Sequence, residues 1–389
     1  MLLKRMVGSS ADAGRQRIGI NAHLLSGEAG YRRAGIHQYI AQVLRHLPRE
    51  EDEMEHLVFT RHRADFLNRP DLLIRYSRWP TERRLVRIVW EQLAWPWLAA
   101  RQQLNLLHSM AFVTPVLSPC PNVVTVYDLS FIYFPDRFPA WQRFYLRSQT
   151  GRSCRQSRRV ITISESSRQD VHRFFGVPLS SIDVVRPGVD DVYQPLPAAD
   201  VANFCRRKGL GHFILHIGTL QPRKNIPVLL EAFARLTDPA LQLVLVGGKG
   251  WLFEEIFKRV ETLGLQDRVH FTGYVPDDEL PLWYNAAALL VFPSVYEGFG
   301  MPVVEAMACG TPVIAADSSS IPEAAGAAGV LFAPHDVIEL ADRIEAVLND
   351  ATLASTMRRK GLDQARHFSW ERAGRETAAV YHRALVKHE

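Results

Sequence analysis

Two glutamates bracket a glycine-containing turn in the run Glu-Gly-Phe-Gly-Met-Pro-Val-Val-Glu, which extends from Glu297 to Glu305. The run lies between a predicted buried strand at 288–292 and a predicted helix at 302–309. Pro302 suits a first helical turn because it has no N–H to leave unpaired. The preceding glycines let backbone N–H groups approach a ligand at the helix N-terminus, where the dipole favours an anion. The segment therefore predicts a site for a negatively charged, polyhydroxylated ligand. The alternative is an ordinary strand-to-helix turn with solvated glutamates.

A second candidate element is the adjacent pair Arg223 and Lys224. It follows an apolar strand predicted at 213–218 and precedes an amphipathic helix predicted at 228–236. In open α/β sheets ligands bind at the carboxyl ends of the strands. A guanidinium beside an ammonium suits the charged oxygens of a diphosphate, so the pair predicts phosphate binding. The alternative is a solvated pair on a surface loop.

Together these elements resemble the donor-binding half of the retaining nucleotide-sugar glycosyltransferases of glycosyltransferase family 4, with its bacterial mannosyltransferase-type members as the nearest likeness. Five spaced segments carry the resemblance in order along the C-terminal half of the chain. They are Gly218 with Arg223-Lys224-Asn225, the Gly247-Gly248 turn, residues 273–280, residues 297–306, and the Gly-Thr-Pro-Val-Ile run from Gly310.

The resemblance also implies roles for individual residues. Arg223 and Lys224 stabilise the departing diphosphate, Glu297 contacts hydroxyls of the donor sugar, and Glu305 accepts hydrogen bonds from the ribose. The catalytic set is then Arg223, Lys224, Glu297 and Asp128. The implied donor-binding set is Gly218, Thr219, Arg223, Lys224, Gly247, Tyr274, Val275, Glu297, Gly298, Phe299, Gly300, Met301, Pro302, Val303 and Glu305.

The N-terminal half contributes an acceptor side with Gly35 and Tyr127. A strand-like run at 17–24 is followed by Gly27, Gly30 and Gly35 and by a helix near 36–47, and a buried strand at 122–126 ends at Tyr127-Asp128. Many relatives have His-Asp there, with the histidine facing the transferred sugar. A phenol has a reference pKa near 10 and is a poor base at neutral pH. Tyr127 either substitutes for the histidine or simply packs as an aromatic side chain.

The fold class expected is α/β, because strands and helices alternate throughout the 389 residues, of which 47% are hydrophobic. The resemblance implies two Rossmann-like domains facing a cleft, the glycosyltransferase B fold. We expect a flexible leader at 1–16, an acceptor-binding domain at 17–190, a nucleotide-sugar-binding domain at 191–366, and a helix at 367–389 that crosses back onto the N-terminal domain. A terminal helix docked on its own domain is the alternative.

Charge is divided unevenly between the two halves. Residues 1–190 hold 27 Lys and Arg against 17 Asp and Glu, whereas the remainder holds 19 against 24. Arginines interleaved with tryptophans near 75–97, and a second arginine cluster at 143–159, suit an anionic membrane surface. The alternatives are a solvated basic face and a surface that binds nucleic acid, and we do not expect nucleic acid as a partner.

No apolar run in the sequence could span a bilayer. The four scattered cysteines are expected to be buried free thiols. We therefore expect a cytoplasmic protein, peripheral on the inner face of the membrane.

The expected activity is retaining transfer of a hexose to a glycan or lipid-linked acceptor, with no metal and no cofactor beyond the nucleotide-sugar donor. No Asp-x-Asp signature stands at a strand end. GDP-mannose is the first choice of donor and a UDP-hexose the second. A nucleotide-sugar epimerase of the same fold is the nearest rival, and a basic nucleic-acid-binding protein is a remote one. An NAD-dependent enzyme would need Gly-x-Gly-x-x-Gly after a strand, which the sequence lacks.

Overall fold

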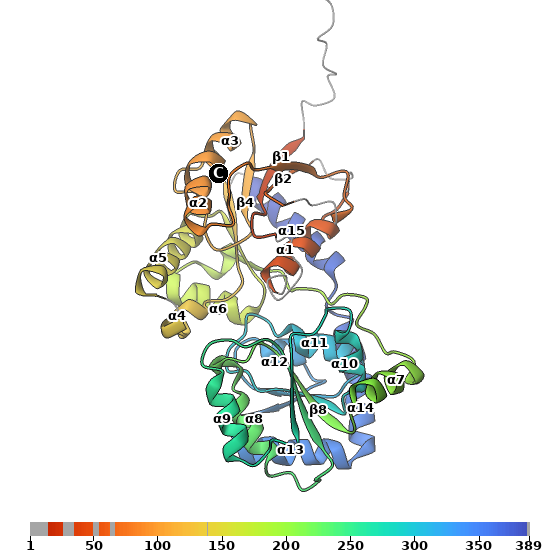
Figure 1. The fold of residues 1–389 in the computed structure, drawn as a ribbon. Helices are drawn as coiled ribbons and strands as arrows, with labels where there is room; N and C mark the ends of the chain where they lie inside the picture. The colour runs from red at the N-terminus through yellow and green to blue at the C-terminus, as the bar shows by residue number, and fades with distance from the viewer. Residues whose placement is uncertain (1–14, 26–34, 50–53, 63–66, 138, 387–389) are drawn as a thin grey trace, which may run out of the picture.

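The chain forms two α/β domains, shown in Figure 1, in a computed structural model that describes residues 15–25, 35–49, 54–62, 67–137 and 139–386. Over these residues the N-terminal domain has a seven-stranded parallel sheet with the order β3-β2-β1-β4-β5-β6-β7. Its strands are β1 (Gln16–Asn21), β2 (Met54–Thr60), β3 (Leu73–Tyr76), β4 (Leu106–Ser109), β5 (Asn122–Val126), β6 (Arg159–Thr162) and β7 (Ile182–Val184).

The central strands β4 and β5 are buried along their whole length. This burial is expected of a parallel sheet that helices cover on both faces. A π-helical turn at Trp90–Ala94 joins two of these helices, so that residues 84–101 form one uninterrupted helical rod. The α-helices are α1 (Ile36–His46), α2 (Arg84–Val89), α3 (Trp95–Arg101), α4 (Ser130–Tyr133), α5 (Ala140–Gln156) and α6 (Glu165–Phe175).

The C-terminal domain repeats the plan with a six-stranded parallel sheet, counted over the described residues, in the order β10-β9-β8-β11-β12-β13. Its strands are β8 (Phe213–Ile217), β9 (Gln242–Val246), β10 (Val269–Gly273), β11 (Leu289–Phe292), β12 (Val313–Ala316) and β13 (Val330–Phe332). Its helices are α7 (Ala198–Lys208), α8 (Ile226–Phe233), α9 (Glu254–Thr262), α10 (Leu280–Ala286), α11 (Met301–Ala308), α12 (Ile321–Ala325), α13 (Val337–Asn349) and α14 (Ala351–Ala365).

The last helix, α15 (Trp370–Leu385), returns to the N-terminal domain and packs against α1 (Figure 1). The helices approach closely at Gly374, where an added Cβ would lie 2.0 Å from the carbonyl oxygen of His46. Farther along, the Tyr381 hydroxyl lies 2.8 Å from Nδ1 of the buried His108 in β4. The expected crossing of the C-terminal helix is thus confirmed, and docking on its own domain is excluded.

Element types agree with the sequence-based expectations, while several boundaries differ. The strand expected at 17–24 ends at Asn21, and the helix expected at 228–236 begins earlier, at Ile226. Gly27, Gly30 and nearly all of the expected leader lie outside the described residues. Cys154 and Cys309 are buried as expected, but Cys120 and Cys205 are only half-buried. In the described part of the chain, none of the helices combines the length and the apolar character that crossing a bilayer requires.

Candidate active site

The candidate donor site lies where the strand order of the C-terminal sheet reverses direction. Strand β8 pairs with β9 on one side and with β11 on the other, so the connections leaving β8 and β11 diverge to opposite sides. This point, at the carboxyl ends of the strands, is where open α/β sheets bind ligands. The segment after β8 holds Arg223 and Lys224, and the segment after β11 holds Glu297.

The three side chains form a compact ion-pair cluster. Arg223 Nη1 donates to Glu297 Oε2 over 2.7 Å, and Lys224 Nζ donates to Glu297 Oε1 over 2.6 Å. Arg223 Nη1 also reaches the carbonyl oxygen of Tyr296 at 2.9 Å. Lys224 is 6% and Glu297 9% exposed. The alternative of a solvated basic pair and solvated glutamates is therefore wrong for Lys224 and Glu297.

Burial and pairing act in opposite directions on this cluster. Burial alone would raise the pKa of Glu297, yet the charges and hydrogen bonds of Arg223 and Lys224 outweigh it and lower that pKa to about 2. Burial would likewise depress the pKa of Arg223, but the adjacent carboxylate raises it. Glu297 is therefore a fixed anion at neutral pH that holds two cations in place at the strand ends.

Backbone close to the cluster leaves no room for larger residues. A Cβ added at Gly218 would lie 3.1 Å from Lys224 Cε, and one at Gly247 would lie 2.1 Å from the Gly218 carbonyl oxygen. On the other side, Lys224 Nζ stands 4.9 Å from the centre of the Phe292 ring, within cation–π range. The structure thus brings Gly218 and Gly247 together with Arg223, Lys224 and Glu297.

Glu305 lies within α11, the helix that follows the loop after Glu297, and is 8% exposed. The hydroxyl of Tyr284, on α10, donates to Glu305 Oε2 over 2.7 Å. Burial, aided by the nearby charges of Asp190 and Asp277, raises the pKa of Glu305 to about 7 despite that hydrogen bond. The carboxyl group therefore titrates near neutrality, in contrast to Glu297.

The remaining predicted donor residues fall into two groups. Gly298, Phe299, Gly300, Met301, Pro302 and Val303 form the loop and first turn of α11, and Gly300 has a φ of 108°, a conformation that favours glycine. Thr219 and Tyr274 are exposed, while Val275 is buried beside Tyr274. The Tyr274 hydroxyl donates to Asp277 over 3.1 Å. The charge of Asp277 also acts on Glu305, so this loop lies near Glu305.

On the acceptor side, the phenol of Tyr127 points into the N-terminal domain. It donates to the Met110 carbonyl oxygen over 2.7 Å, and the ring packs edge-on against Tyr39. Burial raises the pKa of Tyr127 well above its usual range. Asp128 is half-buried and accepts a hydrogen bond from the Ser130 N–H over 2.9 Å. Gly35 is exposed, with a φ of 70°, at the start of α1.

The two domains meet at Gly298. A Cβ added there would lie 2.8 Å from the Tyr127 carbonyl oxygen and 3.4 Å from Asp128 Cβ. The loop that follows Glu297 therefore touches the segment that follows β5, and the predicted donor and acceptor residues adjoin across the interface. Only a residue without a side chain allows this approach.

Sequence reasoning missed the residues that hold the domains together. Tyr296 inserts into the N-terminal domain, where its hydroxyl accepts from the Leu129 N–H over 2.9 Å and donates to Asp170 Oδ2 over 3.0 Å. The ring lies 4.5 Å from that of Tyr133. No pattern in the sequence connects Tyr296 with Asp170. The available signal for Tyr296 was its position immediately before the predicted site residue Glu297.

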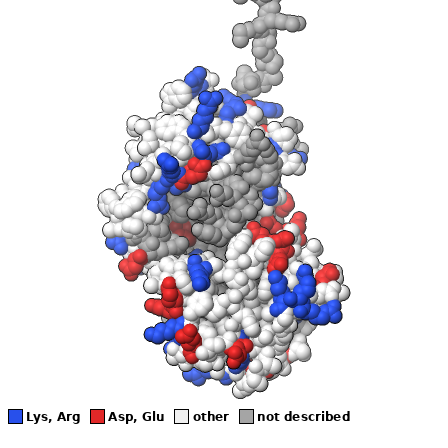
Figure 2. Space-filling model, viewed as in Figure 1, with Lys and Arg blue, Asp and Glu red and all other residues white. Residues whose placement is uncertain are grey.

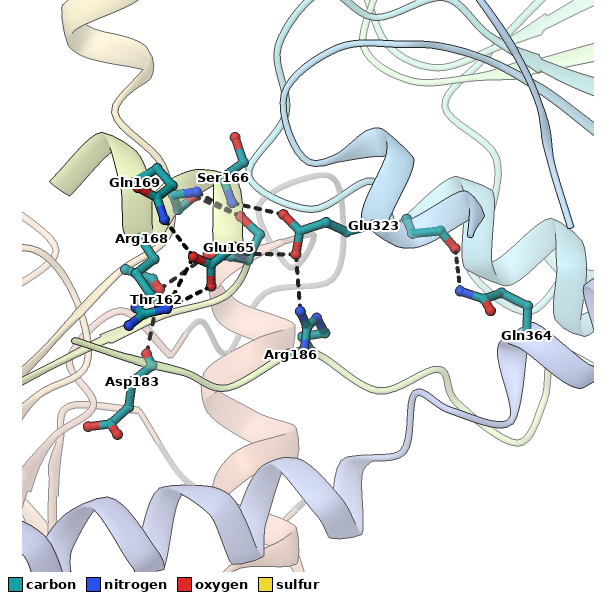
Figure 3. A network of polar contacts seen from close by, with 12 residues as sticks. Thr162, Glu165, Ser166, Arg168, Gln169, Asp183, Arg186, Glu323 and Gln364 are labelled. Atoms are coloured by element: carbon teal, nitrogen blue, oxygen red, sulfur yellow. Dashed lines mark hydrogen bonds and ion pairs between the residues drawn. The ribbon is translucent and has the colours of Figure 1, made fainter. Parts of the chain in front are cut away.

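A second interdomain contact is made by Glu323 of α12, drawn in Figure 3. Its two carboxylate oxygens accept from the N–H groups of Glu165 and Ser166, each over 2.8 Å, at the start of α6. These N–H groups have no partner within their own helix, and a helix N-terminus favours an anion. Arg186 lies 3.3 Å from the same carboxylate. Helix α6 of the N-terminal domain thus receives two contacts from the C-terminal domain, one at its first turn from Glu323 and one at Asp170 from Tyr296.

Two further features of the described residues bear on ligands. No three His, Cys, Asp or Glu side chains in the described ranges converge as metal ligands would. A cavity of about 870 Å³ opens between α1, the linker and the C-terminal helices, and it is lined by none of the predicted site residues. The candidate site is therefore defined by the strand ends and not by this cavity.

Two adjoining Rossmann-type domains with a charged site at the strand ends are the architecture of the glycosyltransferase B fold. The model of "Glycosyltransferase Family 4" matches residues 33–192, and that of "Glycosyl transferases group 1" matches residues 206–364. The chain is 34% identical over 264 residues to O-antigen chain mannosyltransferase B of Escherichia coli, covering 67% of this chain and 69% of that protein. This protein belongs to the family 4 glycosyltransferases and is a hexosyltransferase.

Two other matches extend the comparison. The chain is 28% identical over 265 residues to the serotype-specific mannosyltransferase WbdA of Escherichia coli, a much longer protein of which it spans 32%. Among solved structures, HepE of Anabaena in complex with UDP-glucose superposes with a TM-score of 0.74 at 20% identity, covering 95% of this chain and all of that one. The structural match shows the shared fold.

Proposed function

We propose that this glycosyltransferase moves mannose from GDP-mannose to a growing glycan or lipid-linked acceptor in polysaccharide biosynthesis, with retention at the anomeric carbon. The donor choice is supported by the likeness to two mannosyltransferases, O-antigen chain mannosyltransferase B and WbdA. The observation that carries the proposal is the buried Arg223–Glu297–Lys224 cluster at the carboxyl ends of β8 and β11. A UDP-hexose is the second candidate donor, since HepE, which shares the fold, was solved with UDP-glucose.

In this proposal the diphosphate of the donor binds against Arg223 and Lys224. Glu297 holds both cations through one carboxylate, so they are oriented before the donor arrives. Such preorganised charges stabilise a leaving group without reorganisation at the moment of reaction. Glu305 accepts hydrogen bonds from the ribose, and the Gly298–Gly300 backbone faces the donor sugar.

The reaction we propose breaks the bond between the anomeric carbon and the diphosphate oxygen and forms a bond between that carbon and an acceptor hydroxyl oxygen on the same face. The acceptor proton passes to an oxygen of the departing diphosphate. Neither step requires a metal or another cofactor, because Arg223 and Lys224 offset the charge that develops on the leaving group. Tyr127 is not a base in this scheme, since its phenol is buried and bonded to the Met110 carbonyl oxygen.

Two measurements test the proposal. A thermal-shift series over GDP-mannose, GDP-glucose, UDP-glucose and UDP-N-acetylglucosamine should show the largest stabilisation with GDP-mannose, since a ligand at about 100 times its dissociation constant adds about 2.7 kcal/mol to folded-state stability. Equal stabilisation by GDP-glucose would count against mannose, and a larger shift with UDP-glucose would favour the second donor.

Nucleotide release then distinguishes transfer from epimerisation. Release of GDP that depends on an added glycan acceptor supports transfer. Conversion of the donor sugar to its epimer without an acceptor would instead support the epimerase of the same fold.

A cytoplasmic location at the inner face of the membrane is part of the proposal, because nucleotide sugars and lipid-linked acceptors meet there.

A further inference from the structure

An exposed apolar stripe runs along the helical rod at 84–101. Leu85, Val89, Leu93 and Trp97 are four residues apart and are 69%, 43%, 67% and 57% exposed. On the opposite face of the same rod Trp90, Trp95 and Ala99 are buried in a cluster against β2 and β4. The rod therefore has two apolar faces, of which one packs on the sheet and the other has no protein partner among the described residues.

The π-helical turn at Trp90–Ala94 keeps the stripe on one face. In a regular α-helix, residues four apart are offset by about 40° around the axis, so a stripe of four would drift across the surface. A π turn is wider than an α turn, and it compensates part of this drift between Val89 and Leu93. All four side chains of the stripe are exposed, while Trp90 and Trp95 of the same rod stay buried against the sheet.

Two neighbouring elements enlarge this surface. Leu117, in the loop after β4, is 78% exposed, and Phe144, on α5, is 75% exposed. Gln92 of the rod holds that loop through the Val116 N–H at 2.8 Å, and Arg152 of α5 holds it through the Thr114 carbonyl oxygen at 2.8 Å. The rod, the loop and α5 thus form one continuous face.

The charges around this face are almost all positive. Residues 84–101 and 140–156 contain seven arginines and one carboxylate, Glu91. That carboxylate is buried and faces Asn21 instead of solvent. Arg101 lies 5.2 Å from the Trp97 ring, as an amphipathic pair at a membrane interface would. Figure 2 shows Lys and Arg side chains over the part of the N-terminal domain that holds α2 and α3.

We propose that this face, made of the 84–101 rod, Leu117 and the start of α5, docks on an anionic lipid bilayer. Separate apolar side chains projecting from two helices and a loop can insert into the headgroup boundary, while the arginines contact lipid phosphates. Nucleic acid would be contacted by the arginines but not by Leu93, Leu117 or Phe144. The inference rests on the membrane location in the proposed function and deepens it by naming the surface that makes the contact. It does not depend on the identity of the donor, which the nucleotide-sugar measurements test separately.

The test is co-sedimentation of the full-length protein with vesicles of phosphatidylcholine alone and with vesicles of equal parts phosphatidylcholine and phosphatidylglycerol. We expect binding to the anionic vesicles only. Replacing Leu93 and Phe144 together with serine should weaken that binding at least tenfold. The matched control replaces Leu252 and Ile338 with serine; these exposed apolar residues of the C-terminal domain are 49% and 60% exposed, and binding should stay within twofold.

A second variant addresses charge. Replacing Arg143 and Arg147 with glutamine should weaken binding to the anionic vesicles by about fivefold for each charge, as expected for about 1 kcal/mol per basic residue near the surface. Equal binding to both vesicle types, or no loss in the Leu93 and Phe144 variant, would overturn the proposal. Self-association abolished by the same variant, or retention on duplex DNA in place of vesicles, would assign the face to a second copy or to nucleic acid instead.

Discussion

The hydroxyl of Tyr296 donates to Asp170 Oδ2 over 3.0 Å, and this hydrogen bond joins the two domains one residue before the charged cluster at Glu297. The same hydroxyl accepts from the Leu129 N–H, two residues from Tyr127. Tyr296 thus ties the loop that carries Glu297 to the segment that carries Asp128. The contact between the two domains therefore also fixes the position of the Glu297 loop against the acceptor side.

Replacing Tyr296 with phenylalanine should weaken the contact between the two domains. The Leu129 N–H and Asp170 would each lose a partner, at a cost of about 1–3 kcal/mol for buried groups. We expect kcat to fall about tenfold or more while binding of the free nucleotide changes little, because the C-terminal domain alone holds Arg223, Lys224 and Glu305. Steady-state kinetics and calorimetric titration with GDP would measure the two effects. An unchanged kcat would show that the bond does not contribute to the productive geometry. Tyr76→Phe, at an exposed position on β3, is the control.

The charged pair provides the second prediction. Lys224→Ala should lower the transfer rate by at least an order of magnitude and weaken binding of the free nucleoside diphosphate, since this cation contacts the diphosphate before and during the reaction. The protein should remain folded by circular dichroism. Lys208→Ala, which removes a half-exposed lysine of α7 that pairs with Glu279, is the matched control. Turnover of Lys224→Ala within twofold of the parent would remove the phosphate role.

The same cluster shows how far the sequence could lead. The strand-helix alternation and the two charged loops predicted the domains and placed Arg223 and Lys224 at strand ends. Their pairing with Glu297, more than 70 positions away, depends on β8 lying beside β11, which no local pattern reports. The interdomain residues were harder still, because no local pattern sets Tyr296 and Glu323 apart. Their side chains find their partners in the other domain, and Asp170, which Tyr133 already contacts within its own domain, accepts from Tyr296 as well.

The third prediction contrasts Glu305 with Glu297. Burial raises the pKa of Glu305 from 4.5 to about 7, so the folded protein binds one proton more than the unfolded chain between these values. The stability this group contributes is present below pH 4.5 and declines as pH rises to 7. Ribose hydroxyls bind better to the ionised carboxylate, so affinity for GDP-mannose should increase as pH rises through 7. Calorimetric titration against pH would show the step, and Glu305→Gln should abolish it.

Glu297→Gln should give a different signature. The pKa of Glu297 is about 2, so this carboxylate does not titrate in the working range. Its replacement leaves Arg223 and Lys224 partly unpaired and misplaced, and the main effect should be on kcat. If both glutamine variants raised only the KM for the donor by similar factors, Glu297 would be another donor-binding residue.

The fourth prediction tests the close approach at Gly298. A methyl group added there would meet the Tyr127 carbonyl oxygen at 2.8 Å, so Gly298→Ala should hold the domains apart without disturbing either core. We expect a tenfold or greater loss of activity with little change in melting temperature, and small-angle scattering should show a more open particle. Gly211→Ala, where the nearest atom outside the neighbouring residues is 4.0 Å away, is the control. Parental activity in Gly298→Ala would mean that the observed approach is not needed for transfer.

The last prediction concerns Tyr127 and Asp128. The Tyr127 phenol is buried and bonded to a backbone carbonyl, so Tyr127→Phe should retain most activity, losing one hydrogen bond worth about 1 kcal/mol of stability. Asp128→Ala should be the more damaging change, because Asp128 accepts from the Ser130 N–H and lies beside Gly298 and the Arg223 charge. Its loss leaves a donor unpaired at the point where the domains touch. pH–rate profiles of both folded variants provide the measurement. A thousandfold loss in Tyr127→Phe beside a near-normal Asp128→Ala would reverse these roles and make the phenol the functional counterpart of the histidine found in relatives.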